Sequence, residues 1–251
     1  MKKPLIKFAT YLIFIFIIFL IFFSISNFSL KELYILFKDE NFLSAIYFGL
    51  KTSILATFFS AIFGIPAGFY LSRNHSLIDK IIDSFFEIPI IIPPLIVGVL
   101  LLNFFNADVI KTFYKFIFTF QGAAIAQFII SFPYTLKASK NSFELIPTVY
   151  EEIAMTLGAS PFKSFIDTTF KLSINGIISG LILSWVRSFG EFGATLLVAG
   201  GITGKTENLS IYIYKNMVEG EFNKGITASL ITIFIAVLAI SLLKIFIIEK
   251  H

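Results

Sequence analysis

The feature that most limits how this chain can fold is a series of long apolar runs, each able to cross a lipid bilayer. The first, residues 5–25, contains one charged residue, Lys7. As a helix, its roughly 21 residues at about 1.5 Å each span a hydrocarbon core of about 30 Å. It is longer than the apolar core of a secretory signal, and no small-residue cleavage site follows it. We therefore expect a retained transmembrane helix.

Five further apolar runs follow: residues 45–72, 81–105, 116–138, 172–199 and 225–248. The segments between them, 27–41, 73–76, 106–115 and 200–224, are read as polar loops, the last with an amphipathic piece that begins at Leu209. The pattern predicts an all-α integral membrane protein with six transmembrane helices. We expect one membrane domain over residues 1–251, with 1–26 as its first helix and 45–248 as a five-helix core.

Composition excludes several other classes of protein. Hydrophobic residues make up 57% of the chain, above the 45–50% or so that is usual for soluble domains. Charged residues are too scarce, at 14%, for a nucleic-acid-binding face. There is no cysteine, and the two histidines, His75 and His251, form no cluster of metal ligands. Since no catalytic set of side chains is apparent either, we expect neither an enzyme nor a bound cofactor or metal.

A polar segment, residues 147–165, interrupts the apolar pattern, and we call it the elbow. Tyr150, Ile153, Ala154 and Leu157 follow one another at helical spacing and share one face. Gly158 comes directly after this face, where a left-handed helix C-cap requires a residue without a β-carbon. Ser160 and Pro161 then have the residue types of an N-cap and a first helical position. The segment predicts a helix, a glycine turn and a second helix; an amphipathic connector lying on the lipid surface is the alternative.

The elbow resembles the EAA loop of ABC importer permeases, the cytoplasmic element that docks onto the ATPase subunit. The family pattern is Glu-Ala-Ala, three residues and Gly, and here Glu152-Ile153-Ala154 precedes Gly158 at that spacing. Further on, where the family has Ile-x-Leu-Pro, this chain departs from the pattern with Thr168, Phe170 and Lys171. The resemblance implies coupling helices between the fourth and fifth transmembrane helices. It assigns ATPase docking to Tyr150, Glu151, Glu152, Ile153, Ala154, Leu157, Gly158 and Ala159.

Charged residues and prolines inside the apolar runs indicate a translocation pathway. Arg187 and Glu191 are four residues apart, so they share a helix face and can neutralise one another. Because a charge at membrane depth costs several kcal/mol, such a pair is a candidate for function; a structural clamp between helices is the alternative. Tandem prolines in the third run free backbone groups that cannot face lipid, unless they only kink the helix. The predicted pathway residues are Pro93, Pro94, Arg187, Gly190, Glu191, Gly193 and Thr195.

The segment from Arg187 to Gly200 is similar to the fifth-helix motif of permeases for molybdate and tungstate, and Gly193-Ala194-Thr195 favours this branch over the related sulfate permeases. The resemblance implies the type I ABC importer architecture. It also implies a homodimeric permease that works with two ATPase subunits, which bind ATP and Mg²⁺, and with an extracytoplasmic substrate-binding protein. A sulfate or thiosulfate permease is the alternative within this class. A stand-alone anion channel or secondary transporter, with Arg187 and Glu191 as an ion relay, is the alternative outside it.

The basic residues at the start of the chain predict its orientation. Lys2, Lys3 and Lys7 flank the first apolar run, and the basic flank of the first helix usually stays in the cytoplasm. With six spans both termini lie on the same side of the membrane, and the elbow lies there too. We therefore expect a multi-pass plasma-membrane protein with a cytoplasmic elbow, which is the side that an ATPase-docking element needs.

Overall fold

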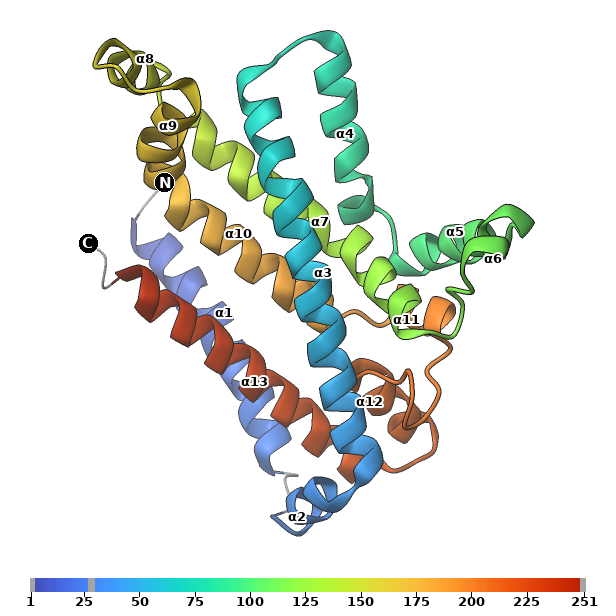
Figure 1. Cartoon of the computed structure of the whole chain (residues 1–251). Helices are drawn as coiled ribbons and strands as arrows, with labels where there is room; N and C mark the ends of the chain where they lie inside the picture. Colours follow the sequence, from blue (N-terminus) through green and yellow to red (C-terminus); the bar gives the residue numbers. More distant parts are fainter. Residues whose placement is uncertain (1–2, 27–29, 249–251) are drawn as a thin grey trace.

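The computed structural model describes residues 3–26 and 30–248, and these residues are helical with no β-strand among them (Figure 1). This confirms the predicted all-α fold. In chain order the elements are α1 (Lys3–Ser26), α2 (Leu30–Lys38), α3 (Glu40–Arg73), α4 (Leu77–Ile91), α5 (Pro94–Asn106), α6 (Asp108–Phe113), α7 (Phe120–Glu144), α8 (Val149–Thr156), α9 (Pro161–Phe165), the π-helical turn η1 (Ile166–Phe170), α10 (Lys171–Phe189), α11 (Gly193–Ala199), α12 (Leu209–Val218) and α13 (Phe222–Ile248).

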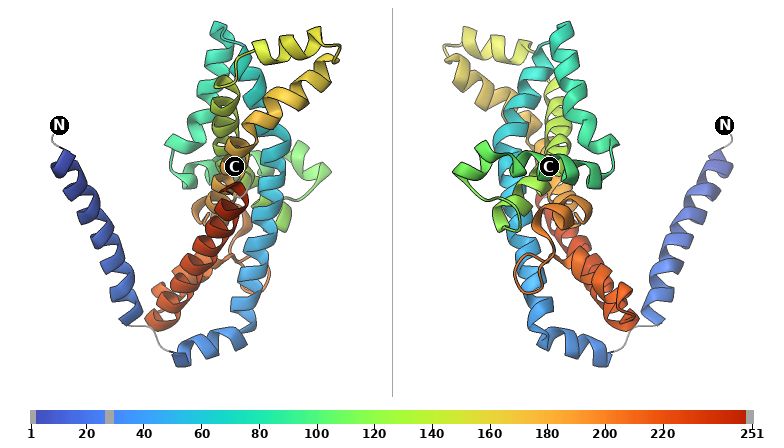
Figure 2. Two further views of the ribbon diagram at one scale, coloured as in Figure 1. Left: turned by 90° about the vertical axis from the view of Figure 1, so that its left-hand side faces the viewer. Right: turned by 90° about the vertical axis from the view of Figure 1, so that its right-hand side faces the viewer.

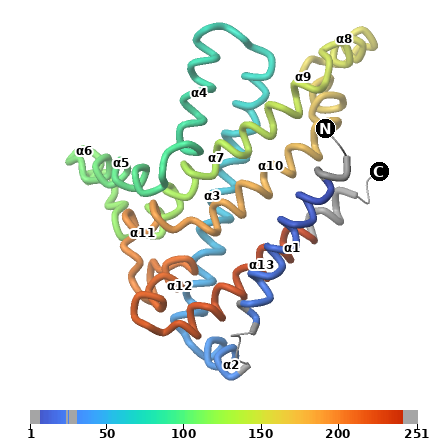
Figure 3. The backbone as a smooth tube through the Cα atoms, turned by 180° about the vertical axis from the view of Figure 1, so that it is seen from behind, coloured from blue at the N-terminus to red at the C-terminus, as the bar shows by residue number. Residues whose placement is uncertain are grey.

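Helices α3, α7 and α10 form the centre of the bundle, and α8 and α9 project from one end of it (Figures 1 and 3). Helices α2 and α12 lie at the opposite end. Helix α1 diverges from the bundle in the side view, and its residues 7–23 are exposed (Figure 2). The bundle therefore has an elbow end, marked by α8, and a foot, marked by α2 and α12.

Small residues allow the three central helices to approach closely. A β-carbon at Gly68 of α3 would lie 2.8 Å from the carbonyl oxygen of Leu136 in α7. A β-carbon at Gly180 of α10 would lie 2.5 Å from that of Ala138, also in α7. Helices in lipid associate through packing and hydrogen bonds rather than through the hydrophobic effect, so such contacts hold the bundle together.

Within the part of the chain that the structure describes, three helical segments are long and apolar enough to cross a membrane: Glu40–Arg73, Pro161–Phe189 and Phe222–Ser241. Helices α4 and α5 together satisfy the same criterion as a broken pair. The stretch Lys7–Phe23 of α1 is apolar but shorter. Helix α7 has 25 residues, but its second half carries Lys137, Lys140 and Glu144.

The predicted third span, residues 81–105, is not one helix, because the chain turns by 110° between α4 and α5. The residue before a proline is disfavoured in the α region, and Ile92-Pro93-Pro94 places two such residues in succession. Both are extended, Ile92 with ψ 147° and Pro93 with ψ 134°. The single proline Pro66 lies inside α3 without ending it. The tandem thus breaks the helix, whereas an isolated proline does not.

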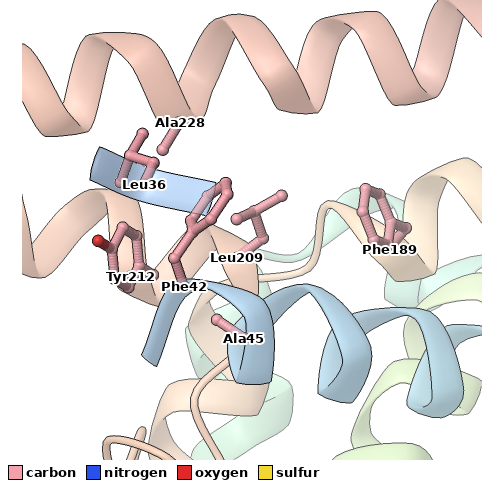
Figure 4. Packing of buried hydrophobic residues seen from close by; sticks show 7 residues of the cluster. All are labelled: Leu36, Phe42, Ala45, Phe189, Leu209, Tyr212 and Ala228. Atoms are coloured by element: carbon pink, nitrogen blue, oxygen red, sulfur yellow. The ribbon is translucent and has the colours of Figure 1, made fainter. Parts of the chain in front are cut away.

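Two predicted loops were wrong, since residues 30–38 form α2 and residues 108–113 form α6. Leu36 of α2 is fully buried in an apolar cluster at the foot, to which four other helices also contribute residues (Figure 4). That cluster consists of Leu36, Phe42, Ala45, Phe189, Leu209, Tyr212 and Ala228. The burial of Leu36 stabilises a helix too short to persist on local propensity alone.

Candidate functional site

The turn of the elbow has the geometry predicted from its glycine. Gly158 has φ +92°, in the left-handed region. Its N–H donates to the carbonyl of Met155 at 2.9 Å, and the N–H of Ala159 donates to the carbonyl of Ala154 at 3.0 Å. This pair of bonds is a Schellman C-cap. A β-carbon at Gly158 would meet no atom within 4 Å, so the turn requires glycine for its backbone conformation alone.

The elbow exposes an apolar face. Leu157 is 84% exposed, Phe162 75% and Ile153 54%, and Tyr150 is also exposed. Glu152 is exposed beside them, whereas Ala154 and Ala159 are half-buried. Large apolar side chains gathered at the tip of a projecting pair of helices are typical of a protein interaction site.

Glu151, one of the residues predicted to dock the ATPase, bonds to other elements of its own chain. Its Oε1 lies 3.2 Å from Nη2 of Arg73, at the end of α3, and accepts a hydrogen bond from the hydroxyl of Thr169 in η1. Its carbonyl accepts a bond from Ser164 of α9 at 2.7 Å. Arg73 also donates to the carbonyl of Ile146, at 3.0 Å. Glu151 therefore braces α8 against three other elements, whereas the side chain of Glu152 is exposed.

The second helix of the elbow begins as predicted, and the hydroxyl of Ser160 accepts a bond from the N–H of Lys163 at 3.4 Å. It does not end in a loop. Helix α9 continues through η1 into α10, and the whole stretch Pro161–Phe189 forms one element of 29 residues. The second helix of the exposed elbow thus runs into a helix of the bundle core without a loop between them.

The predicted fifth span, residues 172–199, is broken at Gly190-Glu191-Phe192, between α10 and α11. The side chain of Glu191 is 1% exposed. Its Oε2 lies 2.7 Å from Nη1 of Arg187, and its Oε1 accepts the N–H of Ala194 at 3.0 Å in the first turn of α11. Glu191 therefore neutralises Arg187 and caps α11 at the same time. Arg187 is the more accessible of the two, with 29% of its side chain exposed.

The two breaks in the bundle lie against one another. A β-carbon at Gly193, where α11 begins, would lie 3.2 Å from the backbone nitrogen of Leu95, which follows Pro93 and Pro94 at the start of α5. The structure therefore brings most of the predicted pathway residues to one region. Gly190 lies in the break itself, with open space around it apart from the carbonyl of Val186. Thr195 is fully buried, 3.5 Å from Nε2 of Gln127 in α7.

Asn208 is a site residue that the sequence did not reveal. It is fully buried, and its Nδ2 donates to the carbonyl of Glu191 at 2.6 Å. Its Oδ1 accepts the N–H of Ile211 at 3.0 Å and so caps α12. The foot is thereby bonded to the break in the fifth span. An asparagine followed by a helical run predicts that Asn208 caps α12. Nothing in the sequence pattern predicts its bond to the carbonyl of Glu191, 17 residues away.

The loop between α11 and α12 is held by a second buried carboxylate. Glu207 is 3% exposed and lies 3.0 Å from Nζ of Lys215, which also bonds Thr203. Burial raises the pKa of the Glu207 carboxyl, and the bond to Lys215 offsets part of this rise. The pKa of Tyr212 is raised as well, chiefly by burial and then by its hydrogen bond to Asp39.

Two ion pairs join α4 to α7, and neither was predicted. Lys140 lies 2.7 Å from Asp83, and Lys137 lies 2.7 Å from Glu87. The apolar side chains Ile78, Ile81 and Phe85 of α4 are exposed. These ion pairs, together with the contact between the rings of Phe86 and Phe132, join α4 to α7, while Ile78, Ile81 and Phe85 are left uncovered.

Solved structures of ABC transporters have this fold. The chain aligns with a bacterial alginate ABC transporter, solved in complex with alginate pentasaccharide-bound periplasmic protein, with a TM-score of 0.76. The alignment is 16% identical and covers 96% of this chain and 90% of that one. It aligns with the MetNI methionine ABC transporter, in an inward-facing conformation, with a TM-score of 0.64, 16% identity and coverage of 89% and 99%. The fold is that of a type I ABC importer permease.

A family model described as the binding-protein-dependent transport system inner membrane component matches residues 64–249. The chain belongs to this family, whose members are permease subunits of ABC transporters. It is 36% identical to the probable transport system permease protein NifC of Clostridium pasteurianum over 71% of this chain and 65% of NifC. It is 34% identical to the molybdenum transport system permease protein ModB of Escherichia coli K12, over 79% of this chain and 90% of ModB.

The chain is also 30% identical to the molybdate/tungstate transport system permease protein WtpB of Thermococcus kodakarensis, over 76% of this chain and 71% of WtpB. These comparisons confirm the family suggested by the two motifs, and they identify a multi-pass membrane protein.

Proposed function

We propose that this chain is the membrane-spanning permease subunit of an ATP-driven importer for molybdate or tungstate, which passes the oxyanion from an extracytoplasmic binding protein into the cytoplasm. The exposed apolar face of the elbow carries the proposal. A channel or secondary transporter that works alone does not need an exposed apolar face of this kind. A permease that is driven by a separate ATPase subunit needs a surface to which that subunit binds. The alignments with ModB and WtpB cover most of this chain. The names of these two relatives, a molybdenum permease and a molybdate/tungstate permease, support the proposed substrate.

The proposed assembly contains two copies of the chain, two ATPase subunits at the elbow end and one binding protein at the foot. Each chain crosses the membrane six times, with both termini and the elbow in the cytoplasm. ATP and Mg²⁺ bind to the ATPase subunits, and this chain performs no catalysis and holds no cofactor. The apolar face of α4 supplies part of the contact between the two copies.

An energy source is physically required for this substrate. Moving a dianion into a cell that is negative inside costs roughly 4.6 kcal/mol per 100 mV, because each charge costs about 2.3 kcal/mol. Closure of the ATPase dimer would displace the elbow, and the continuous helix Pro161–Phe189 would carry that displacement to the break at Glu191. Arg187, held by Glu191 beside this break and partly exposed, is the proposed anion contact.

Reconstitution tests the proposal directly. Proteoliposomes with the chain, its ATPase and the binding protein should accumulate molybdate or tungstate when ATP is supplied, and vesicles with the chain alone should not. Uphill accumulation by the chain alone would refute the proposal. Calorimetry of the binding protein against molybdate, tungstate and sulfate then decides the substrate, and a preference for sulfate would establish the sulfate alternative.

A further inference from the structure

The length of the uncharged part of α3 indicates where Lys51 lies relative to the bilayer. The stretch of α3 from Lys51 to Arg73 has no charged residue between its ends, and at about 1.5 Å per residue it measures roughly 33 Å. This length matches the hydrocarbon core of a bilayer, so the two cationic side chains mark its two boundaries. Lys51 is exposed at the boundary nearer the foot, with its Nζ 4.0 Å from the centre of the Tyr47 ring.

A cavity of about 440 Å³ opens beside Lys51. Lys205, from the loop between α11 and α12, reaches the same cavity, and the hydroxyl of Ser44 adds a polar group to its lining. Within residues 3–26 and 30–248, neither lysine pairs with a carboxylate. The cavity therefore carries two uncompensated positive charges at the level where phospholipid phosphates lie.

A second cavity, of about 450 Å³ and almost wholly apolar, lies further along the same two helices, α3 and α7, and we call the two cavities together the groove. Leu55 and Phe59 line it from α3, one and two turns beyond Lys51 on the same helix face. From α7 it is lined by Ala124 and Phe128, one and two turns beyond Phe120 of the first cavity. Phe48 stacks edge-on against Phe120, and Phe59 does so against Phe128, so each cavity lies beside one α3–α7 aromatic pair.

We propose that this groove between α3 and α7 is a binding site for an anionic phospholipid of the leaflet at the foot. The phosphate lies between Lys51 and Lys205, and an acyl chain fills the apolar cavity beneath. The charge pattern selects this occupant over two others. Helix α1 of a second copy has no acidic residue to meet the lysines. A free oxyanion meets the lysines but leaves the apolar cavity without an occupant. The inference is independent of which substrate the protein transports.

The test measures lipid binding to the full chain purified in detergent, by native mass spectrometry with added phosphatidylglycerol. Double substitution Lys51→Gln/Lys205→Gln should weaken binding about thirtyfold, since each lysine near a membrane surface contributes roughly fivefold. The control Lys38→Gln/Lys224→Gln removes the same charge from the same end of the bundle, from outside the groove, and should bind as the unchanged protein does. All four lysines lie outside the buried core, so both variants should fold.

Ligand analogues distinguish a lipid from a free anion. Phosphatidylglycerol should bind more tightly than phosphatidylcholine, while glycerophosphoglycerol without acyl chains and inorganic phosphate should not displace it. Equal binding by both double variants would overturn the proposal, as would full competition by inorganic phosphate, which would indicate a free-anion site. A Phe59→Cys variant can also be cross-linked to α1 of a second copy. If added lipid did not reduce this cross-linking, protein and not lipid would fill the groove, and the proposal would be overturned.

Discussion

Replacing Gly158 tests whether the bend of the elbow is needed for coupling to the ATPase. Its φ of +92° lies in the left-handed region, where an alanine costs about 1–2 kcal/mol and an asparagine costs less. Because a β-carbon there would touch no neighbour, this backbone strain is the whole cost to the isolated chain. If the docked complex requires the bend, Gly158→Ala should weaken ATPase binding by roughly five- to thirtyfold, since about 1.4 kcal/mol is tenfold.

Two further substitutions separate backbone strain from charge. Gly158→Asn tolerates the left-handed region and should bind the ATPase better than Gly158→Ala does. Gly158→Asp has a similar backbone preference but adds a carboxylate beside Leu157, which is 84% exposed, and so buries a charge on docking. Asp should therefore bind the ATPase more weakly than Asn and should abolish ATP-driven uptake.

The assay is titration of detergent-solubilised permease with its ATPase, followed by uptake into proteoliposomes. Circular dichroism should show unchanged helix content in all three variants, because the rest of the elbow is unaltered. Equal affinities for the Ala and Asn variants would refute the strain argument. Normal uptake by a stably inserted Gly158→Asp protein would refute the assignment of the elbow as the docking element.

Three other substitutions test the braces around the site. Glu151→Ala should destabilise the elbow by about 2 kcal/mol, because it leaves Arg73 and Thr169 without their acceptor, and faster proteolysis after Lys163 would report it. Asn208→Asp keeps the cap of α12 but replaces the donor to the Glu191 carbonyl with a second acceptor. It should therefore lower the melting temperature more than Asn208→Ser does. The reverse order of melting temperatures would contradict the hydrogen bond from Asn208 to Glu191. Because burial raises the pKa of Glu207, the native chain retains a proton there that the unfolded chain loses, so stability should fall as pH rises from the ordinary carboxyl value of 4.5 to the raised one. Glu207→Gln should remove this slope, which thermal melts across that range would measure.

Local chemistry accounts for the parts of the fold that the sequence revealed. Gly158 and Ser160-Pro161 predicted the bend and the second helix, because both depend on backbone preferences of a few adjacent residues. The tandem Pro93-Pro94 suggested an interruption, but its 110° angle depends on how α5 packs against Gly193 of α11. The sequence of α2 does not predict a helix, because the stability of α2 comes from burying Leu36 against distant helices.

Contacts between distant segments account for what the sequence did not reveal. The sequence does not distinguish Glu151 from Glu152, since both occupy the first turn of α8 and either could face outward. Its partner Arg73 is 78 residues away and Thr169 is 18 away, so only the folded chain shows which carboxylate is used internally. The same holds for the bond from Asn208 to Glu191. Residue type predicted where charges and caps are needed, and tertiary packing decided their partners.

The placement of these contacts indicates how the elbow and the membrane break are connected. Glu151 bonds η1, and η1 leads directly into α10, a continuous helix of 19 residues and roughly 28 Å that ends at Gly190. At that end Glu191 is bonded to Arg187, to α11 and, through Asn208, to the start of α12. A helix of this length resists bending, so a displacement of the elbow must shift the break or be absorbed where the helix is least regular. That place is η1, because a π-helical turn has weaker and less regular backbone bonding than the α-helix around it. The bond from Thr169 to Glu151 ties this turn to α8, so the Glu151→Ala variant also tests whether the elbow and α10 are held as one unit.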